Sequence, residues 1–268
     1  MTMQKTILIT GSTDGIGLET ARRLVAEGHH VLVHGRSAAK VDRVVRELSE
    51  ANGDAKVEGF VADLSRPDQR EELATAVSDA HASLDALINN AGVFSTPGED
   101  RGAFDLRFNV NTLAPYVLTK QLLPLLGTTG RVVNVSSAAQ APFELTTLRG
   151  EAESHNAAYA QSKLALTTWS HELAQRLGAD GPIIVAVNPG SLLGTNMVKT
   201  AYGIAGGDVG KGADILCRAA LSDEFAEASG KYFDNDTGRF GDPHPDAVDP
   251  SKGAEMIDIL ERLLAYGA

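Results

Sequence analysis

The chain has 268 residues, a formal net charge of −11 and 43% hydrophobic residues. This composition supports a sizeable core, and we expect one domain over residues 1–268. The acidic charge repels phosphate backbones, so no nucleic-acid partner is expected. Cys217 is the single cysteine, which excludes an intrachain disulfide. The apolar runs are too short for a signal peptide or a membrane span, which favours a cytoplasmic protein.

Short β-branched runs alternate with helical patterns along most of the sequence. Strands are expected at residues 6–10, 30–34, 57–61, 86–89, 131–135 and 183–187. Helical patterns lie between them, for example at residues 18–27, 39–51, 69–80 and 159–177. Several strands are apolar at consecutive positions, as strands covered on both faces are. The sequence therefore predicts an α/β fold with a doubly wound parallel sheet.

Two polar stretches follow the last of these strands. Residues 203–212 are glycine-rich and, with the residues from 193 onward, are predicted to form a mobile substrate loop. Residues 234–268 form a C-terminal tail of the same domain. Its final helix can begin at Asp249, Pro250 and Ser251.

A glycine-rich turn follows the first expected strand, with the sequence Thr10-Gly11-Ser12-Thr13-Asp14-Gly15-Ile16-Gly17. Glycines let the backbone approach a pyrophosphate, which the free N–H groups of the next helix attract. Such a turn alone is weak evidence, because loops also collect glycine. Its position between a strand and a helix predicts a dinucleotide site.

The end of the second strand indicates which dinucleotide binds. An acidic residue there would bond the ribose 2′-hydroxyl of NAD, but the sequence is His34-Gly35-Arg36-Ser37. Arg36 offers a charged planar fork to a 2′-phosphate, and Ser37 adds a hydroxyl donor. NADP(H) is therefore expected. The alternative is that Arg36 is only a solvated loop cation.

Tyr159 and Lys163 are four residues apart in a helical pattern, so their side chains share one face. An ammonium beside a phenol stabilises the phenolate and lowers its pKa, so the pair can act as acid or base. This spacing is common by chance. A predicted strand that ends in Ser136-Ser137, at the edge where α/β sheets bind ligands, strengthens the hypothesis.

Taken in order, these motifs resemble the short-chain dehydrogenase/reductase family from residue 10 to about residue 195. The matching motifs are 10–17, Asp63-Leu64, Asn89-Asn90-Ala91-Gly92, Asn111, Ser137, Tyr159-x-x-x-Lys163 and Pro189-Gly190. The resemblance implies a Rossmann fold and hydride exchange between NADP(H) and a small-molecule carbonyl or alcohol. Tyr159 would transfer the proton, Ser137 would bond the substrate oxygen and Asn111 would hold a water leading to Lys163.

The catalytic residues so implied are Asn111, Ser137, Tyr159 and Lys163. The expected cofactor-binding residues are Gly11, Ser12, Thr13, Gly15, Ile16, Gly17, Arg36, Ser37, Asp63, Leu64, Asn90, Ala91, Gly92, Tyr159, Lys163, Pro189, Gly190 and Thr195. Ser136 and Asn109 are close enough in sequence to be confused with Ser137 and Asn111.

An insertion at residues 143–156 separates Ser137 from Tyr159. Similar insertions occur in the branch that includes retinol dehydrogenases and related carbonyl reductases, so this segment is expected to form part of the substrate-pocket wall. No metal site is expected. His171-Glu172 lacks a second histidine, and the calcium-loop-like start at Asp234 has Pro245 at its twelfth position.

Three functions stay open from the sequence. The first is an NADP(H)-dependent oxidoreductase of ketones, aldehydes and alcohols. The second is a non-catalytic NADP-binding regulator, since a fold does not imply a function. The third is a reductase of an activated C=C or C=N bond. A homodimer, a homotetramer and a monomer are all compatible with the sequence.

Overall fold

The computed structural model describes residues 3–52, 55–94, 104–149 and 152–265. Its eight-stranded sheet has the order β3-β2-β1-β4-β5-β6-β7-β8. The strands are β1 (Thr6–Ile9), β2 (His30–Gly35), β3 (Val57–Val61), β4 (Ala86–Asn89), β5 (Arg131–Val135), β6 (Ile183–Asn188), β7 (Tyr232–Asp234) and β8 (Arg239–Gly241). Neighbouring strands are parallel except β7 and β8. The predicted doubly wound α/β sheet is confirmed.

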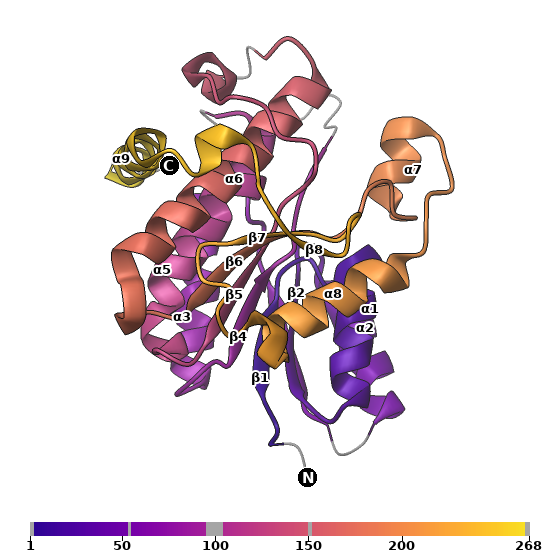
Figure 1. The fold of residues 1–268 in the computed structure, drawn as a ribbon. Coiled ribbons are helices and arrows are strands. Elements are labelled where there is room, and N and C mark those ends of the chain that lie inside the picture. The colour runs from indigo at the N-terminus through magenta and orange to yellow at the C-terminus, as the bar shows by residue number, and fades with distance from the viewer. Residues whose placement is uncertain (1–2, 53–54, 95–103, 150–151, 266–268) are drawn as a thin grey trace.

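The helices cover both faces of the sheet. They are α1 (Gly15–Ala26), α2 (Ala38–Ala51), α3 (Pro67–Ala80), α4 (Leu106–Phe108), α5 (Ala114–Leu126), α6 (His155–Leu177), α7 (Asn196–Tyr202), α8 (Val209–Leu221) and α9 (Pro250–Ala265). Helices α1, α2 and α8 lie on one face, and α3, α5 and α6 lie on the other (Figure 1). A π-helical turn, η1 (Asn109–Leu113), joins α4 to α5.

Side-chain alternation in β1 shows why the apolar runs form strands covered on both sides. Ile7 and Ile9 belong to the core under α1, α2 and α8, whereas Leu8 belongs to the core under α3, α5 and α6. All three side chains are fully buried. Successive residues of a strand point to opposite faces, so an uninterrupted apolar run supplies both cores.

The region from residue 193 to residue 212 has more regular structure than a loop. It contains α7, a bridge between Leu193 and Gly207, and the start of α8 at Val209. Gly203 ends α7 with a φ of +68°, a conformation that glycine adopts without strain. The predicted loop is therefore limited to a few residues between two helices.

The C-terminal tail packs against the second core. Asp249 Oδ1 accepts hydrogen bonds from Ser251 N at 2.8 Å and Lys252 N at 3.1 Å, which caps α9 at the predicted position. Met256, Ile257 and Leu260 are buried in the core that α6 shares. The polar stretch before α9 also contains β8, which the sequence analysis did not predict.

Glu261 of α9 connects the C-terminal tail to α5 through hydrogen bonds. Its carboxylate accepts a hydrogen bond from the Tyr116 hydroxyl and another, at 2.5 Å, from Lys120 Nζ. Tyr116 is 1% exposed, whereas Lys120 is exposed. The tail thereby covers part of the α5 and α6 surface (Figure 1).

No helix in the described ranges combines the length and the apolar character needed to cross a bilayer.

Glu261→Ala should lower the free energy of unfolding by about 1 to 3 kcal/mol, because the buried Tyr116 hydroxyl loses its acceptor. Lys120→Ala removes the exposed partner of the same carboxylate and should cost less than about 1 kcal/mol. Urea unfolding of both variants measures the difference. An equal or larger loss in Lys120→Ala would contradict this account of the tail.

Candidate active site

A cavity of about 770 Å³ opens at the carboxyl edge of the parallel strands. Sheets of this kind bind ligands at this edge, where the strand order reverses between β1 and β4. The predicted site residues that line it are Gly11, Thr13, Gly15, Ile16, Arg36, Asp63, Leu64, Asn90, Ala91, Gly92, Ser137, Tyr159, Lys163, Pro189, Gly190 and Thr195. The fold therefore brings most of the predicted residues to one cavity.

Ser12, Gly17, Ser37 and Asn111 do not line this cavity. Ser12 is fully buried, and its hydroxyl donates to Ile9 O at 2.9 Å. A Cβ on Gly17 would lie 2.4 Å from Asn90 Nδ2, so only glycine fits there. Ser12 and Gly17 thus pack under the glycine-rich turn, on its side away from the cavity.

The glycine-rich turn leads directly into α1. Gly11 and Gly15 have φ values of +65° and +56°, a region that L side chains rarely adopt. Asp14 caps the helix by accepting a hydrogen bond from Gly15 N at 2.8 Å. Gly15 and Ile16, in the first turn of α1, line the cavity. The free N–H groups of such a turn attract an anion.

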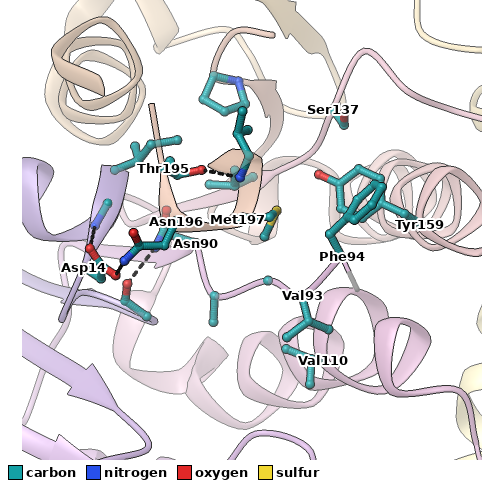
Figure 2. A pocket seen from close by; sticks show the side chains of 18 of the residues that line it. Asp14, Asn90, Val93, Phe94, Val110, Ser137, Tyr159, Thr195, Asn196 and Met197 are labelled. Atoms are coloured by element: carbon teal, nitrogen blue, oxygen red, sulfur yellow. Dashed lines mark hydrogen bonds between the residues drawn. The ribbon is translucent and has the colours of Figure 1, made fainter. Parts of the chain in front are cut away.

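Asp14 also connects this turn to α7, which the sequence analysis missed. Its Oδ2 accepts a hydrogen bond from Asn196 Nδ2, and Figure 2 shows the two side chains meeting across the cavity. A Cβ on Gly15 would lie 3.4 Å from Thr195 Cγ2, so the start of α7 lies against the turn. The two segments are far apart in sequence, and no local motif predicts their contact.

Arg36 is exposed and lines the cavity beyond the end of β2. Within the part of the chain that the structure describes, no carboxylate forms a salt bridge with its guanidinium. Ser37 occupies the N-cap position of α2, where its side chain makes no capping hydrogen bond. Both groups can therefore bind a ligand without losing an existing partner.

Asn111 lies in the π-helical turn and ties the end of β4 to α6. Its Oδ1 accepts from Val93 N at 2.8 Å, and its Nδ2 donates to Val93 O at 2.9 Å and Ser162 Oγ at 3.0 Å. π-turns of this kind are frequent at functional sites. The neighbouring Asn109 instead donates to Ser65 O at 3.2 Å. The two asparagines thus have separate surroundings.

The two serines at the end of β5 also differ in their surroundings. The Ser136 hydroxyl is hydrogen bonded to Thr167 Oγ1 at 2.7 Å, and the residue is 2% exposed. Ser137 is partly exposed, and its hydroxyl accepts from Ala139 N at 3.1 Å. A hydroxyl that accepts this bond can still donate to a ligand.

Tyr159 and Lys163 lie on the same face of α6, and Lys163 Nζ is 5.7 Å from the Tyr159 ring centroid. Lys163 Nζ donates to Val135 O at 2.6 Å. Burial raises the pKa of Tyr159 to about 12, and the hydrogen bond with Ser137 acts in the opposite direction. Burial also lowers the pKa of Lys163 to about 7. Desolvation therefore favours the neutral form of both groups, an effect that the spacing alone did not predict.

The end of the cavity next to Tyr159 is apolar. The Phe94 ring lies 5.0 Å from the Tyr159 ring and 5.4 Å from the Tyr202 ring, measured between centroids. Figure 2 shows Val93 and Val110 below Phe94, and Met197 on the side of the cavity that the Tyr159 hydroxyl faces. This end can enclose an apolar group beside the Tyr159 hydroxyl.

The insertion at residues 143–156 does not form the expected pocket wall. None of its described residues lines the cavity, and residues 150 and 151 lie outside the described residues. The segment packs elsewhere, because Glu144 N and Thr147 Oγ1 both donate to Gln161 Oε1. Asn156 accepts a hydrogen bond at 3.5 Å from the hydroxyl of Tyr202, a residue that lines the cavity.

Asp236 holds the loop that contains Pro189 and Gly190. Its Oδ1 accepts from Ser191 N at 2.8 Å, and its Oδ2 accepts from Ser191 Oγ at 2.5 Å and Asn188 Nδ2 at 2.9 Å. Partial burial raises the pKa of Asp236, but these hydrogen bonds outweigh it and leave the pKa below its ordinary value. Asp236 thus positions this loop, a role that the sequence analysis did not predict.

The doubly wound sheet, with the glycine-rich turn and the cavity at its carboxyl edge, defines a fold of the nucleotide-binding class. Comparison with protein families identifies the family within this class. Residues 5–203 match the family model described as short chain dehydrogenase, and the chain belongs to this family. Its members are oxidoreductases that act on alcohol or carbonyl groups and use nicotinamide cofactors.

Individual relatives agree with this assignment. Human polyprenol dehydrogenase is 36% identical over 207 residues, which cover 73% of this chain but only 62% of the relative. Human retinol dehydrogenase 13 is 29% identical over 285 residues, covering 98% of this chain and 86% of the relative. A short chain dehydrogenase from Shigella flexneri, solved with NADP, is 27% identical with a TM-score of 0.70, covering 87% of this chain and 97% of that structure.

Asp236→Ala should weaken the binding of a nicotinamide cofactor by about three- to tenfold, because the loop at Pro189 loses three hydrogen bonds to one carboxylate. Fluorescence titration with NADPH measures this change. Asp242→Ala, which removes an exposed carboxylate just after β8, serves as the matched control. Equal affinities in the two variants would show that Asp236 does not position the loop.

Proposed function

We propose that this chain is an NADP(H)-dependent oxidoreductase that interconverts a ketone or aldehyde and an alcohol. One observation carries the proposal. The cavity that contains the glycine-rich turn and Arg36 at one end contains Ser137, Tyr159 and Lys163 at the other. A cofactor and a proton-transferring group can therefore meet within one cavity.

The lining residues fit a dinucleotide. Gly11 and Gly15 have no side chain to obstruct a pyrophosphate, and Arg36 is an exposed cation without a salt-bridge partner in the described residues. When bound, the cofactor supplies or accepts the hydride. We assign the 2′-phosphate to Arg36 and Ser37, the adenine to Asp63 and Leu64, and the nicotinamide half to Asn90, Ala91, Gly92, Lys163, Pro189, Gly190 and Thr195. The NADP in the Shigella flexneri relative supports this assignment.

Tyr159 would act as the proton donor in carbonyl reduction. Its raised pKa keeps the phenol protonated at neutral pH, which is the form that an acid catalyst needs. The Ser137 hydroxyl would donate a hydrogen bond to the substrate oxygen and so position it. In alcohol oxidation, the phenol must first lose its proton. Lys163, with a pKa near 7, can then exchange a proton with it.

The apolar lining supports a substrate whose reacting group is attached to an apolar body. Phe94, Met197 and Tyr202 surround the side of the cavity next to Tyr159. The names of two relatives, polyprenol dehydrogenase and retinol dehydrogenase 13, refer to alcohols. We therefore propose apolar alcohols and their aldehydes or ketones as the first compounds to test.

Arg36→Asp should lower the ratio of kcat/KM for NADP(H) over NAD(H) by about tenfold or more, because a charge-assisted contact with the 2′-phosphate becomes a repulsion. Arg43→Asp makes the same change of charge on the exposed face of α2 and should alter the ratio much less. Steady-state kinetics with both cofactors compares the variants. An unchanged ratio in Arg36→Asp would remove Arg36 from the cofactor site.

Tyr159→Phe should lower kcat by a factor of about 10² to 10⁴, because the variant lacks the phenolic hydroxyl that donates the proton. NADPH affinity should be unchanged, because the aromatic ring is kept. Tyr202→Phe removes a hydroxyl from the same aromatic group and should lower kcat by less than about tenfold. Absorbance of the reduced nicotinamide, with a panel of ketones, aldehydes and alcohols, gives the rates.

The same panel separates the alternative functions. Cofactor binding by the wild-type chain without turnover of any compound would favour a regulator. Turnover confined to compounds with activated C=C or C=N bonds would favour that class of reductase. A fully active Tyr159→Phe variant would contradict the proposed proton donor.

A further inference from the structure

Three side chains with metal-binding atoms meet at the edge of the sheet opposite the cavity. His30 begins β2, Glu58 lies near the start of β3, and His81 follows the last residue of α3. None of the three lines the active-site cavity. The cluster therefore needs an explanation that is independent of the oxidoreductase chemistry.

The sheet register explains why these residues meet. Leu32 of β2 pairs with Glu58 of β3, so His30, two residues before Leu32, points to the same face as Glu58. Leu32 belongs to the core under α3, and α3 ends beside this face at His81. Two strands and one helix thus each contribute one side chain.

The distances between the donor atoms suit one small cation. His30 Nε2 is 2.9 Å from Glu58 Oε1, and His81 Nε2 is 3.4 Å from Glu58 Oε2. Donor atoms from all three residues lie within 4.8 Å of one another. A tetrahedral zinc ion, with ligands at about 2.0 to 2.2 Å, separates its ligand atoms by about 3.4 Å. Small side-chain adjustments would bring the three donors to that spacing.

The histidines are also held in place before any ion binds. Their side chains are 10% and 11% exposed for His30 and His81, and their rings lie 5.3 Å apart in an edge-to-face arrangement. The Phe60 ring is 6.3 Å from the His81 ring. Glu58 is 45% exposed and gives an ion a path from solvent. Fixed imidazoles lose little side-chain entropy on binding.

The surroundings of His81 indicate that the cluster binds a metal ion and is more than a set of hydrogen-bonded side chains. His30 Nε2 forms a hydrogen bond with Glu58, whereas the buried His81 Nε2 lies 3.4 Å from Glu58 Oε2 without forming a hydrogen bond to it or to any other described residue. A buried polar atom without a partner is costly, and such atoms call for a specific explanation. A cation between the two rings and the carboxylate would give His81 Nε2 a ligand bond.

We propose that His30, Glu58 and His81 bind a divalent transition-metal ion, with Zn²⁺ as the ion to test. Two imidazoles and one carboxylate form a donor set that zinc accepts, with the fourth position left to water. The ion would join β2, β3 and α3 at the edge of the sheet. The ion would take no part in the proposed oxidoreductase reaction, because the site lies at the end of the strands away from Tyr159 and Lys163.

The test is a Zn²⁺ titration of the EDTA-treated, dialysed full chain in competition with a chromogenic chelator. Wild type should bind one Zn²⁺ per chain, and the ion should raise its Tm by mass action. His81→Gln and Glu58→Gln should each weaken binding by about tenfold or more. His244→Gln, which changes a histidine outside the cluster, should bind Zn²⁺ as wild type does.

Circular dichroism and NADPH titration check that each variant is folded. If His81→Gln does not fold, X-ray absorption of zinc-loaded wild type replaces it and should show two histidine nitrogens bound to zinc. The proposal is overturned if wild type binds no stoichiometric Zn²⁺, if folded His81→Gln binds as tightly as wild type, or if fewer than two histidines surround the ion.

Discussion

The contact between the ends of β1 and β4 is the constraint on which the rest of the site depends. Asn90 Nδ2 donates to Thr10 O at 2.9 Å and Gly11 O at 3.1 Å, and Thr10 Oγ1 accepts from Asn90 N and Ala91 N, each at 3.0 Å. Gly17 packs so closely against Asn90 that a Cβ would collide with it. These bonds set the glycine-rich turn beside the end of β4. They therefore fix the relative position of the two halves of the cavity.

Burial has opposite consequences for the two ionisable groups on α6. It raises the pKa of Tyr159 to about 12 and lowers that of Lys163 to about 7, because in each case the charged form is the one that loses hydration. At neutral pH the phenol of Tyr159 therefore keeps its proton, while the pKa of the Lys163 amine lies near 7. Surroundings that exclude water also strengthen the electrostatic effect of the charges inside them. Burial thus shifts the pKa of both groups toward their neutral forms.

The sequence predicted what depends on local pattern. Apolar runs such as 30–34 located the strands, and the turn at Gly11 located one end of the cavity. Strands β7 and β8 were missed because a strand of three residues carries no periodicity. The bonds from Asp236 to Ser191, and the meeting of His30 with His81, were missed because only the folded chain brings these residues together. The insertion was assigned to the pocket wall from a resemblance, and packing on Gln161 overrode it.

The segment from Ser191 to Tyr202 belongs to both ends of the cavity. Asn196 donates a hydrogen bond to Asp14 beside the glycine-rich turn, while the Tyr202 ring packs against the Phe94 ring in the apolar end. Leu192 has a φ of +50°, which costs a non-glycine residue about 1 to 2 kcal/mol, and its carbonyl accepts from Gly207 N at 2.8 Å. A strained backbone persists only where surrounding bonds hold it. One restrained segment therefore links the shape of the apolar end to the position of the residues beside the glycine-rich turn.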